Sequence, residues 1–281
     1  MVVRIARVWF VSFAVVCVFA AVALAQESLA DAARRKTFDQ LLDLYVRNGD
    51  VYYRALKAER AKLDGYLNQV ASASAAKMSR EEQMAFWLNA YNAIVLRTVV
   101  DHYPISGHSP EYPQKSIRQI PGAFERLQHR VAGKMLTLDQ IEKDVLPTFN
   151  DPRVYFALGR GAIGSGRLRS EAFVPARIED QLSDIAAECV QRGQCVQVEP
   201  ESGKVTASAI FSWREKDFSA AYADKAPQVL TDRSPIERAV IAFVYPKLLN
   251  AEKDLVARNT FQLVYKPFDW TLNDLTGRGG R

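Results

Sequence analysis

The stretch VYFALGRGAIGSGRLRSEAF, residues 154–173, is the segment on which the fold of this chain is centred. Its apolar start, residues 154–158, predicts a short buried strand. Glycine lets a backbone approach a ligand closely, and arginine offers a planar fork of donors that suits carboxylate or phosphate. The stretch therefore predicts an anion-binding loop in which Arg160 and Arg167 stand on either side of Ser165. The loop's glycines and remaining arginine are Gly159, Gly161, Gly164, Gly166 and Arg169.

Residues 1–25 have the order of a secretory signal peptide. Arg4 and Arg7 precede a long apolar run, and Ala23 and Ala25 stand before Gln26. This pattern predicts cleavage after Ala25 and an exported protein, periplasmic or secreted, that does not stay in a membrane. Because the apolar run is long, a retained N-terminal membrane anchor is the alternative.

The chain from residue 26 to 281 has the size of one large domain or two small ones. Removal of residues 1–25 leaves 256 of the 281 residues and takes two arginines from a formal net charge of +5, which leaves +3. That excess is small, and no basic run with interleaved aromatic residues accompanies it, so nucleic-acid binding is not expected. In an oxidising compartment the two remaining cysteines, Cys189 and Cys195, are expected to form a disulfide. A metal pair would need further ligands at suitable spacing.

The strongest helical signal spans residues 79–103. Ser79 followed by Glu82 predicts a capping box, and the run that follows is apolar nearly all round, as in a central buried helix. Asn89 and Asn92 interrupt this run on the face that carries Glu82. Buried amides need hydrogen-bond partners. The two asparagines either bond the backbone of neighbouring loops or form the polar wall of a cleft.

Other patterns predict a series of helices and short hairpins around this helix. Thr137 and Gln140 form the pattern of a second capping box, and Glu142, on the helix that follows, is either solvated or reaches into the site. The fold class is therefore α+β: a single compact domain at residues 26–281, whose central helix packs on a small, mainly antiparallel sheet. Helices are expected at 38–46, 55–70, 138–145, 176–190 and 234–249, hairpins at 130–136 (turning at Gly133 and Lys134) and 196–207, and a strand at 261–265.

Six blocks of sequence carry a resemblance to a known family. They are FWLNAYNA (86–93), KSIRQIPGAFE (115–125), TLDQIE (137–142), FALGRGAIGSGRLRSEAF (156–173), IFSWREKDF (210–218) and FDWTLN (268–273). In this order they resemble the domain of unknown function 547 (DUF547) family over about residues 84–273. The resemblance implies a compact α+β domain with a polar cleft near residues 154–173, and no established activity.

This chain departs from the family pattern at the positions that suggest chemistry. Family members that it resembles have a segment close to HFALxCGAxSCPxL, in which a histidine and one or two cysteines make a thiol nucleophile conceivable. Aligned without gaps, Tyr155 stands at the histidine position, Arg160 at the first cysteine position and Ser165 at the second. The proline after the second cysteine is Gly166. Cysteine chemistry is therefore not expected here.

Ser165 is the remaining candidate nucleophile, but its surroundings lack the usual signals. A serine needs a base in hydrogen-bond reach, and none of His102, His108 and His129 stands at the family's histidine position. Ile163 replaces the first glycine of a nucleophile elbow.

The glycine spacing also copies a dinucleotide-binding fingerprint, at positions 159, 161 and 164. No helix start or βαβ unit follows it, as that motif requires. No zinc motif is present either, so neither a cofactor nor a metal is expected.

Three functions remain after these exclusions. The favoured one is a non-catalytic or catalytically decayed binding domain, whose glycine and arginine loop holds a small anionic ligand or a component of the cell envelope. The second is an envelope hydrolase or transferase that uses Ser165, with Tyr155, Glu142 or Asp269 in support. The third is a structural interaction module with solvated arginines. Residues expected to contact a ligand are Arg160, Arg167, Gly161, Gly164, Tyr155, Asn89, Asn92, Glu142 and Asp269.

Overall fold

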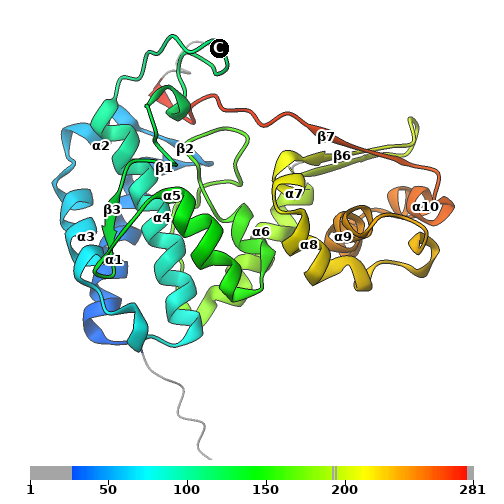
Figure 1. Cartoon of the computed structure of the whole chain (residues 1–281), viewed down its shortest axis with the longest axis horizontal. Coiled ribbons are helices and arrows are strands. Elements are labelled where there is room, and N and C mark those ends of the chain that lie inside the picture. The colour runs from blue at the N-terminus through cyan, green and yellow to red at the C-terminus, as the bar shows by residue number, and fades with distance from the viewer. Residues whose placement is uncertain (1–26, 192, 194, 277–281) are drawn as a thin grey trace, which may run out of the picture.

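The computed structural model describes residues 27–191, 193 and 195–276, and shows a mainly helical α+β fold (Figure 1). Helices α1 to α5 gather on one side, and a three-stranded sheet lies with α7 to α10 on the other, with α6 between them. The expected signal peptide lies outside the described residues. Within those residues, no helix is long and apolar enough to cross a membrane.

The helices follow most of the predicted segments. The predicted helix at 55–70 is split into two, α2 and α3, with β1 and β2 forming a hairpin before it at Asn48 and Gly49. Helix α4 is the longest described. The helices are α1 (Leu29–Tyr45), α2 (Tyr53–Ala58), α3 (Ala61–Ser72), α4 (Arg80–His102), α5 (Leu138–Gln140), α6 (Ile178–Gln191), α7 (Ala209–Trp213), α8 (Glu215–Tyr222), α9 (Pro235–Val244) and α10 (Asn250–Arg258).

The strands form two small hairpins and one mixed sheet. In the three-stranded sheet, β6 pairs antiparallel with β5 and parallel with β7. The hairpin of β3 and β4 turns at Ala132 and Gly133, one residue earlier than predicted, and both have positive φ. The strands are β1 (Val46–Arg47), β2 (Asp50–Val51), β3 (His129–Val131), β4 (Lys134–Leu136), β5 (Val196–Glu199), β6 (Lys204–Ser208) and β7 (Gln262–Lys266).

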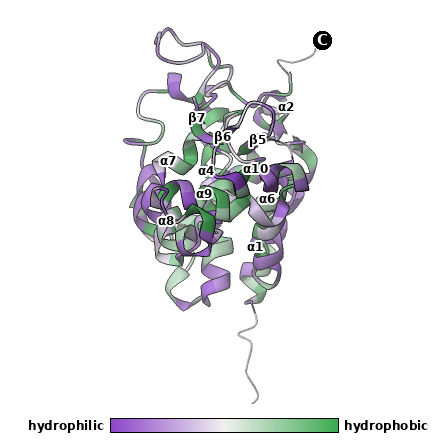
Figure 2. Cartoon of the chain, turned by 90° about the vertical axis from the view of Figure 1, so that its right-hand side faces the viewer, coloured by the Kyte–Doolittle hydropathy of each residue, from purple (hydrophilic) through white to green (hydrophobic). Residues whose placement is uncertain are grey.

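Helix α4 is the central buried helix that the sequence predicts. Its capping box is formed: the Ser79 hydroxyl accepts from the Glu82 amide, and the Glu82 carboxylate accepts from the Ser79 amide. The helices that pack most closely against it are α1, α2, α3, α5 and α6. Hydrophobic residues gather in the middle of the molecule around α4 and α9, and the buried residues form one cluster (Figure 2).

The predicted strand at 154–158 is also wrong. The chain forms a 3-10 helix at Pro152–Phe156, where the Asp151 carboxylate caps the Arg153 amide and Pro152 stands at the first turn. The segment is nevertheless buried, because Phe156 packs on the aromatic rings of Phe211 and Phe243. A five-residue apolar run shows that a segment is buried but does not fix its backbone conformation.

The expected disulfide between Cys189 and Cys195 is present. Their Cα atoms are 5.0 Å apart, which suits a disulfide. The bridge joins the end of α6 to the start of β5, so the sheet is tied covalently to the helix that lies between the two halves of the fold.

Candidate functional site

Helix α4 holds the loop at 157–173 through two buried asparagines. The Asn92 side chain donates to the Ala157 carbonyl (3.1 Å) and accepts from the Gly159 amide (2.8 Å). The Asn89 side chain bonds the carbonyl and amide of Phe173 in the same way, at 2.9 Å each. Both amides therefore fix the two ends of the loop, which is the first of the two alternatives that the sequence left open.

The glycines of the loop are required by close packing of the chain on itself. A Cβ atom on Gly166 would lie 1.7 Å from the Phe156 carbonyl oxygen, and one on Gly164 would lie 2.6 Å from the Asp269 amide nitrogen. Gly161 has a φ of 66° and packs on Val95 of α4. Protein atoms thus occupy the space that the glycines leave, rather than leaving it open for a ligand.

Arg160 belongs to a buried cluster of charges. Its guanidinium donates to both carboxylate oxygens of Glu142 (2.7 and 3.2 Å) and to the Tyr155 carbonyl. Arg214 also donates to Oε1 of Glu142 (2.8 Å), and the Tyr91 hydroxyl donates to Oε2 (3.0 Å). Burial alone would raise the pKa of Glu142, but the charges and hydrogen bonds of Arg160 and then Arg214 outweigh it and lower the pKa to about 2.

This geometry does not support Arg160 as an anion ligand. Its side chain is 3% exposed and its charge is matched by Glu142, whose own side chain is 8% exposed. Glu142 therefore lies inside the molecule and is not a solvated surface charge. Its ion-pair partners are Arg160 and Arg214 of the chain itself. The cluster joins the π-helical turn Ile141–Val145 to the loop and to the start of α8.

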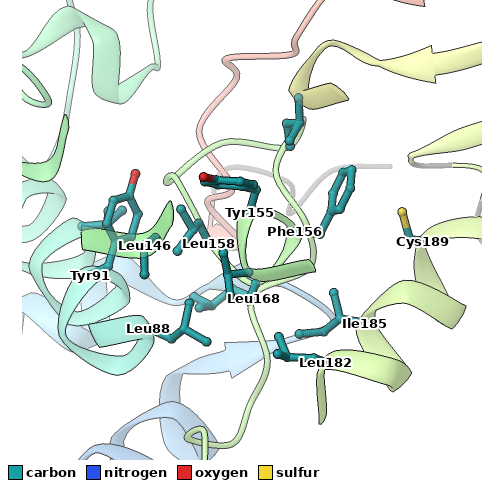
Figure 3. Packing of buried hydrophobic residues seen from close by; sticks show 14 of the residues in the cluster. Leu88, Tyr91, Leu146, Tyr155, Phe156, Leu158, Leu168, Leu182, Ile185 and Cys189 are labelled. Atoms are coloured by element: carbon teal, nitrogen blue, oxygen red, sulfur yellow. The ribbon is translucent and has the colours of Figure 1, made fainter. Parts of the chain in front are cut away.

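Tyr155 is held between the charge cluster and α8. Its hydroxyl donates to Asp217 (2.7 Å), and the Arg214 guanidinium lies 4.7 Å from its ring centre. Figure 3 shows the Tyr155 hydroxyl on the side of Tyr91, whereas Phe156 lies on the opposite side, toward Cys189 of α6. Burial and then the hydrogen bond to Asp217 raise the pKa of Tyr155 well above its usual value. The hydroxyl is thus a donor and stays protonated at ordinary pH.

Ser165 is buried and has a structural partner. Its hydroxyl oxygen accepts from the Arg160 amide (3.0 Å), and its own amide donates to the Ala162 carbonyl. No histidine, lysine or carboxylate bonds its hydroxyl in the part of the chain that the structure describes. An oxygen that accepts from an amide without a base to take its proton is a weak nucleophile.

The two outer arginines of the loop line a separate pocket of about 410 Å³. Arg167 pairs with Glu188 of α6 (2.8 Å), and Arg169 pairs with Glu171 (3.1 Å). Arg35 of α1 and Arg177 complete the basic side of this pocket, which we call the outer pocket. The structure therefore separates Arg167 from Arg160, although only six residues lie between them in sequence.

Asp269 lies apart from both groups. It is exposed, its carboxylate accepts from the Thr271 amide, and its backbone carbonyl accepts from the Gly164 amide. Asp269 therefore contacts the loop through its backbone, and its side chain caps its own turn. No group of three or more His, Cys, Asp and Glu side chains suited to a metal occurs in the residues that the structure describes.

Comparison with known proteins identifies the segment that carries α4, the loop and α6. A family model described as "Protein of unknown function, DUF547" matches residues 75–190. This segment is similar to DUF547 domains. The match confirms the family resemblance of the sequence, although it ends before the blocks at 210–218 and 268–273. The chain matches no curated protein and no solved structure.

Two residues that lie after the matched segment bond to residues within it: Arg214 bonds Glu142, and Asp217 bonds Tyr155. The sequence analysis missed both as site residues. They lie in the block IFSWREKDF, which pointed to the family without pointing to a role for either side chain. Tyr91 was missed within FWLNAYNA, because an aromatic residue on an apolar helix is usually part of the core. The run of four charged residues between Trp213 and Phe218 was the available signal.

Proposed function

We propose that the protein is an exported binding domain that performs no chemistry at the loop 157–173. The observation that carries this proposal is the buried ion cluster of Arg160, Glu142 and Arg214 at the position where related sequences suggest a thiol. The proposal of export depends on the N-terminal sequence pattern, which predicts that the exported chain begins at Gln26.

Three residues stand where related sequences have a histidine and two cysteines. Each of them has a structural partner, which supports a binding role over a catalytic one. Tyr155 donates to Asp217, Arg160 pairs with Glu142, and Ser165 accepts from the Arg160 amide. Catalysis by Ser165 would need a base in place of that amide and space for a substrate carbonyl beside it. The loop instead has its backbone packed against Phe156 and Asp269.

The ligand that suits this loop is a small carboxylate or phosphate held in the outer pocket. Arg177 is 53% exposed, and its recorded carboxylate contact, to Glu171, is 3.6 Å long. The Arg169 Nη1 atom is buried, forms no hydrogen bond and lies 3.7 Å from the Glu188 carboxylate. The lining contains four arginines and three carboxylates, and two of these arginines, Arg35 and Arg167, pair with Glu27 and Glu188 outside the lining. Arg177 therefore retains donors for charge-assisted hydrogen bonds to an anion, and Arg169 adds its positive charge to the same pocket.

Inorganic phosphate is the probe for this ligand class. We expect Arg177→Ala and Arg169→Ala to weaken phosphate binding several-fold at low salt, and the difference from the unmodified protein to shrink as salt rises. Arg130→Ala, an exposed arginine of β3 outside the pocket, is the matched control and should leave binding unchanged. Equal losses in all three variants would show a general charge effect instead.

The hydrolase alternative is tested separately with a fluorophosphonate. Stoichiometric labelling that disappears in Ser165→Ala would establish a reactive serine and overturn the non-catalytic proposal. Absence of labelling together with absence of phosphate binding would favour the third function, a structural interaction module.

A further inference from the structure

A second pocket, distinct from the outer pocket, lies between the 3-10 turns at 146–156 and helix α8, and its volume is about 300 Å³. This size is at the lower end of small-ligand sites. Its walls are apolar on two sides, formed by Leu146, Pro147 and Pro152 on one and by Ala220 and Ala221 of α8 on the other. The pocket is called the α8 pocket below.

Asp217 provides a negative charge in the α8 pocket. One carboxylate oxygen, Oδ2, accepts from the Tyr155 hydroxyl at 2.7 Å, and both residues line the pocket. In the part of the chain that the structure describes, no lysine or arginine pairs with Asp217, and Oδ1 has no recorded donor. The carboxylate is half-buried and can accept further hydrogen bonds from a ligand.

The other charged side chains near this pocket belong to ion pairs. Asp151, which also lines it, forms an ion pair with Arg153 (2.7 Å), and Arg153 pairs in turn with Glu179. Arg214, which stacks on the Tyr155 ring, is paired with Glu142. No lysine or arginine is among the lining residues, so Asp217 is the one carboxylate of the lining that forms no ion pair.

We propose that the α8 pocket binds a small organic cation, a primary ammonium group on a short alkyl chain. The ammonium group donates to Asp217, which is a charge-assisted hydrogen bond of the stronger kind. The alkyl chain packs on the proline and alanine walls. An anion is disfavoured because the lining offers no cation. A metal ion is disfavoured because the second carboxylate of the lining, Asp151, is bonded to Arg153, which leaves Asp217 with too few further oxygen ligands.

Three probes of equal length separate the role of charge from that of the alkyl chain: n-butylamine, n-butanol and butyrate. Binding is followed by NMR shifts of the amides of residues 146–156 and 217–221. We expect n-butylamine, which is protonated at neutral pH, to bind at least about tenfold more tightly than n-butanol, and butyrate to bind most weakly. Equal binding of the amine and the alcohol would overturn the proposal on the unmodified protein alone.

Variants then test whether Asp217 supplies the negative charge that binds the amine. Asp217→Asn should weaken n-butylamine binding at least about tenfold and leave n-butanol binding unchanged, whereas Asp254→Asn on the exposed face of α10 should change neither. Loss of amine binding in Asp254→Asn as large as in Asp217→Asn would show a general charge effect. Arg177→Ala should have no effect, which keeps this result separate from the outer pocket.

Discussion

Arg160 and Glu142 form an ion pair that is shielded from water, with Nη2 and Oε1 2.7 Å apart and side chains 3% and 8% exposed. The pair joins a loop to a helical turn, and Arg214, the residue between α7 and α8, adds a third member. Two arginines share one carboxylate, so the cluster depends on Glu142 more than on either cation. Removal of that carboxylate leaves two buried cations without a partner.

Glu142→Gln is therefore expected to lower the free energy of unfolding by about 3–5 kcal/mol, the cost of breaking a buried ion pair from one side. Urea unfolding of Glu142→Gln and of the unmodified protein measures this loss of free energy. The control is Asp139→Asn, which removes the carboxylate of an ion pair with Lys143 whose lysine side chain is 58% exposed, and should cost less than about 1 kcal/mol. A loss below about 1 kcal/mol in Glu142→Gln would contradict a stabilising role for the cluster.

The same carboxylate predicts a dependence of stability on acid. The pKa of Glu142 is lowered from 4.5 to about 2 in the folded protein, so the unfolded chain takes up its proton first as the pH falls. The stabilisation by ionised Glu142 is complete above pH about 4.5 and is lost progressively toward pH about 2. We expect the free energy of unfolding to fall more steeply between pH 5 and 2.5 in the unmodified protein than in Glu142→Gln. Equal slopes would show that Glu142 is not held ionised by its partners.

The amides of α4 are expected to be structural. Asn89→Leu and Asn92→Leu should each lower the free energy of unfolding by about 1–3 kcal/mol per lost buried hydrogen bond, because the loop amide and carbonyl that each side chain bonds are left unpaired. Asn68→Leu, on the exposed side of α3, is the control. A near-zero cost for both α4 variants with altered ligand binding would restore the cleft-wall alternative.

Local sequence patterns predicted the parts of the fold that depend on neighbouring residues. The capping box of Ser79 and Glu82 involves positions three apart, and the hairpin of β5 and β6 follows from its turn residues, so both were predicted from short windows. The run at 154–158 was predicted as buried but not as a 3-10 helix. Its conformation depends on Asp151 and Pro152 before it and on the aromatic rings that pack against Phe156.

The charge cluster could not be predicted in this way. Glu142 meets Arg160 across 18 positions of sequence and Arg214 across 72, so no local pattern indicates the contacts. The sequence showed only arginines and glycines next to each other, which is also the pattern of an anion-binding loop. The structure assigns them different partners: Arg160 to a buried carboxylate, and Arg167 to Glu188 at the surface.

The glycines of the loop give a last prediction, in which two substitutions of the same kind have opposite effects. An alanine Cβ at position 166 would lie 1.7 Å from the Phe156 carbonyl oxygen, so Gly166→Ala must displace backbone and should cost about 1–3 kcal/mol or more. Gly65 lies within α3 with no atom within 4 Å of a Cβ, so Gly65→Ala should add about 0.5–1 kcal/mol by its better helix propensity.

Thermal and urea unfolding of Gly166→Ala and Gly65→Ala check these two opposite effects on stability. Gly65→Ala shows that an added methyl group is harmless where space and backbone allow it, so a loss confined to Gly166→Ala reports the close approach of the loop to Phe156. A neutral Gly166→Ala would mean that the loop backbone stands away from Phe156. The space beside Ser165 would then be open, and the case for a structural rather than a reactive serine would lose its main support.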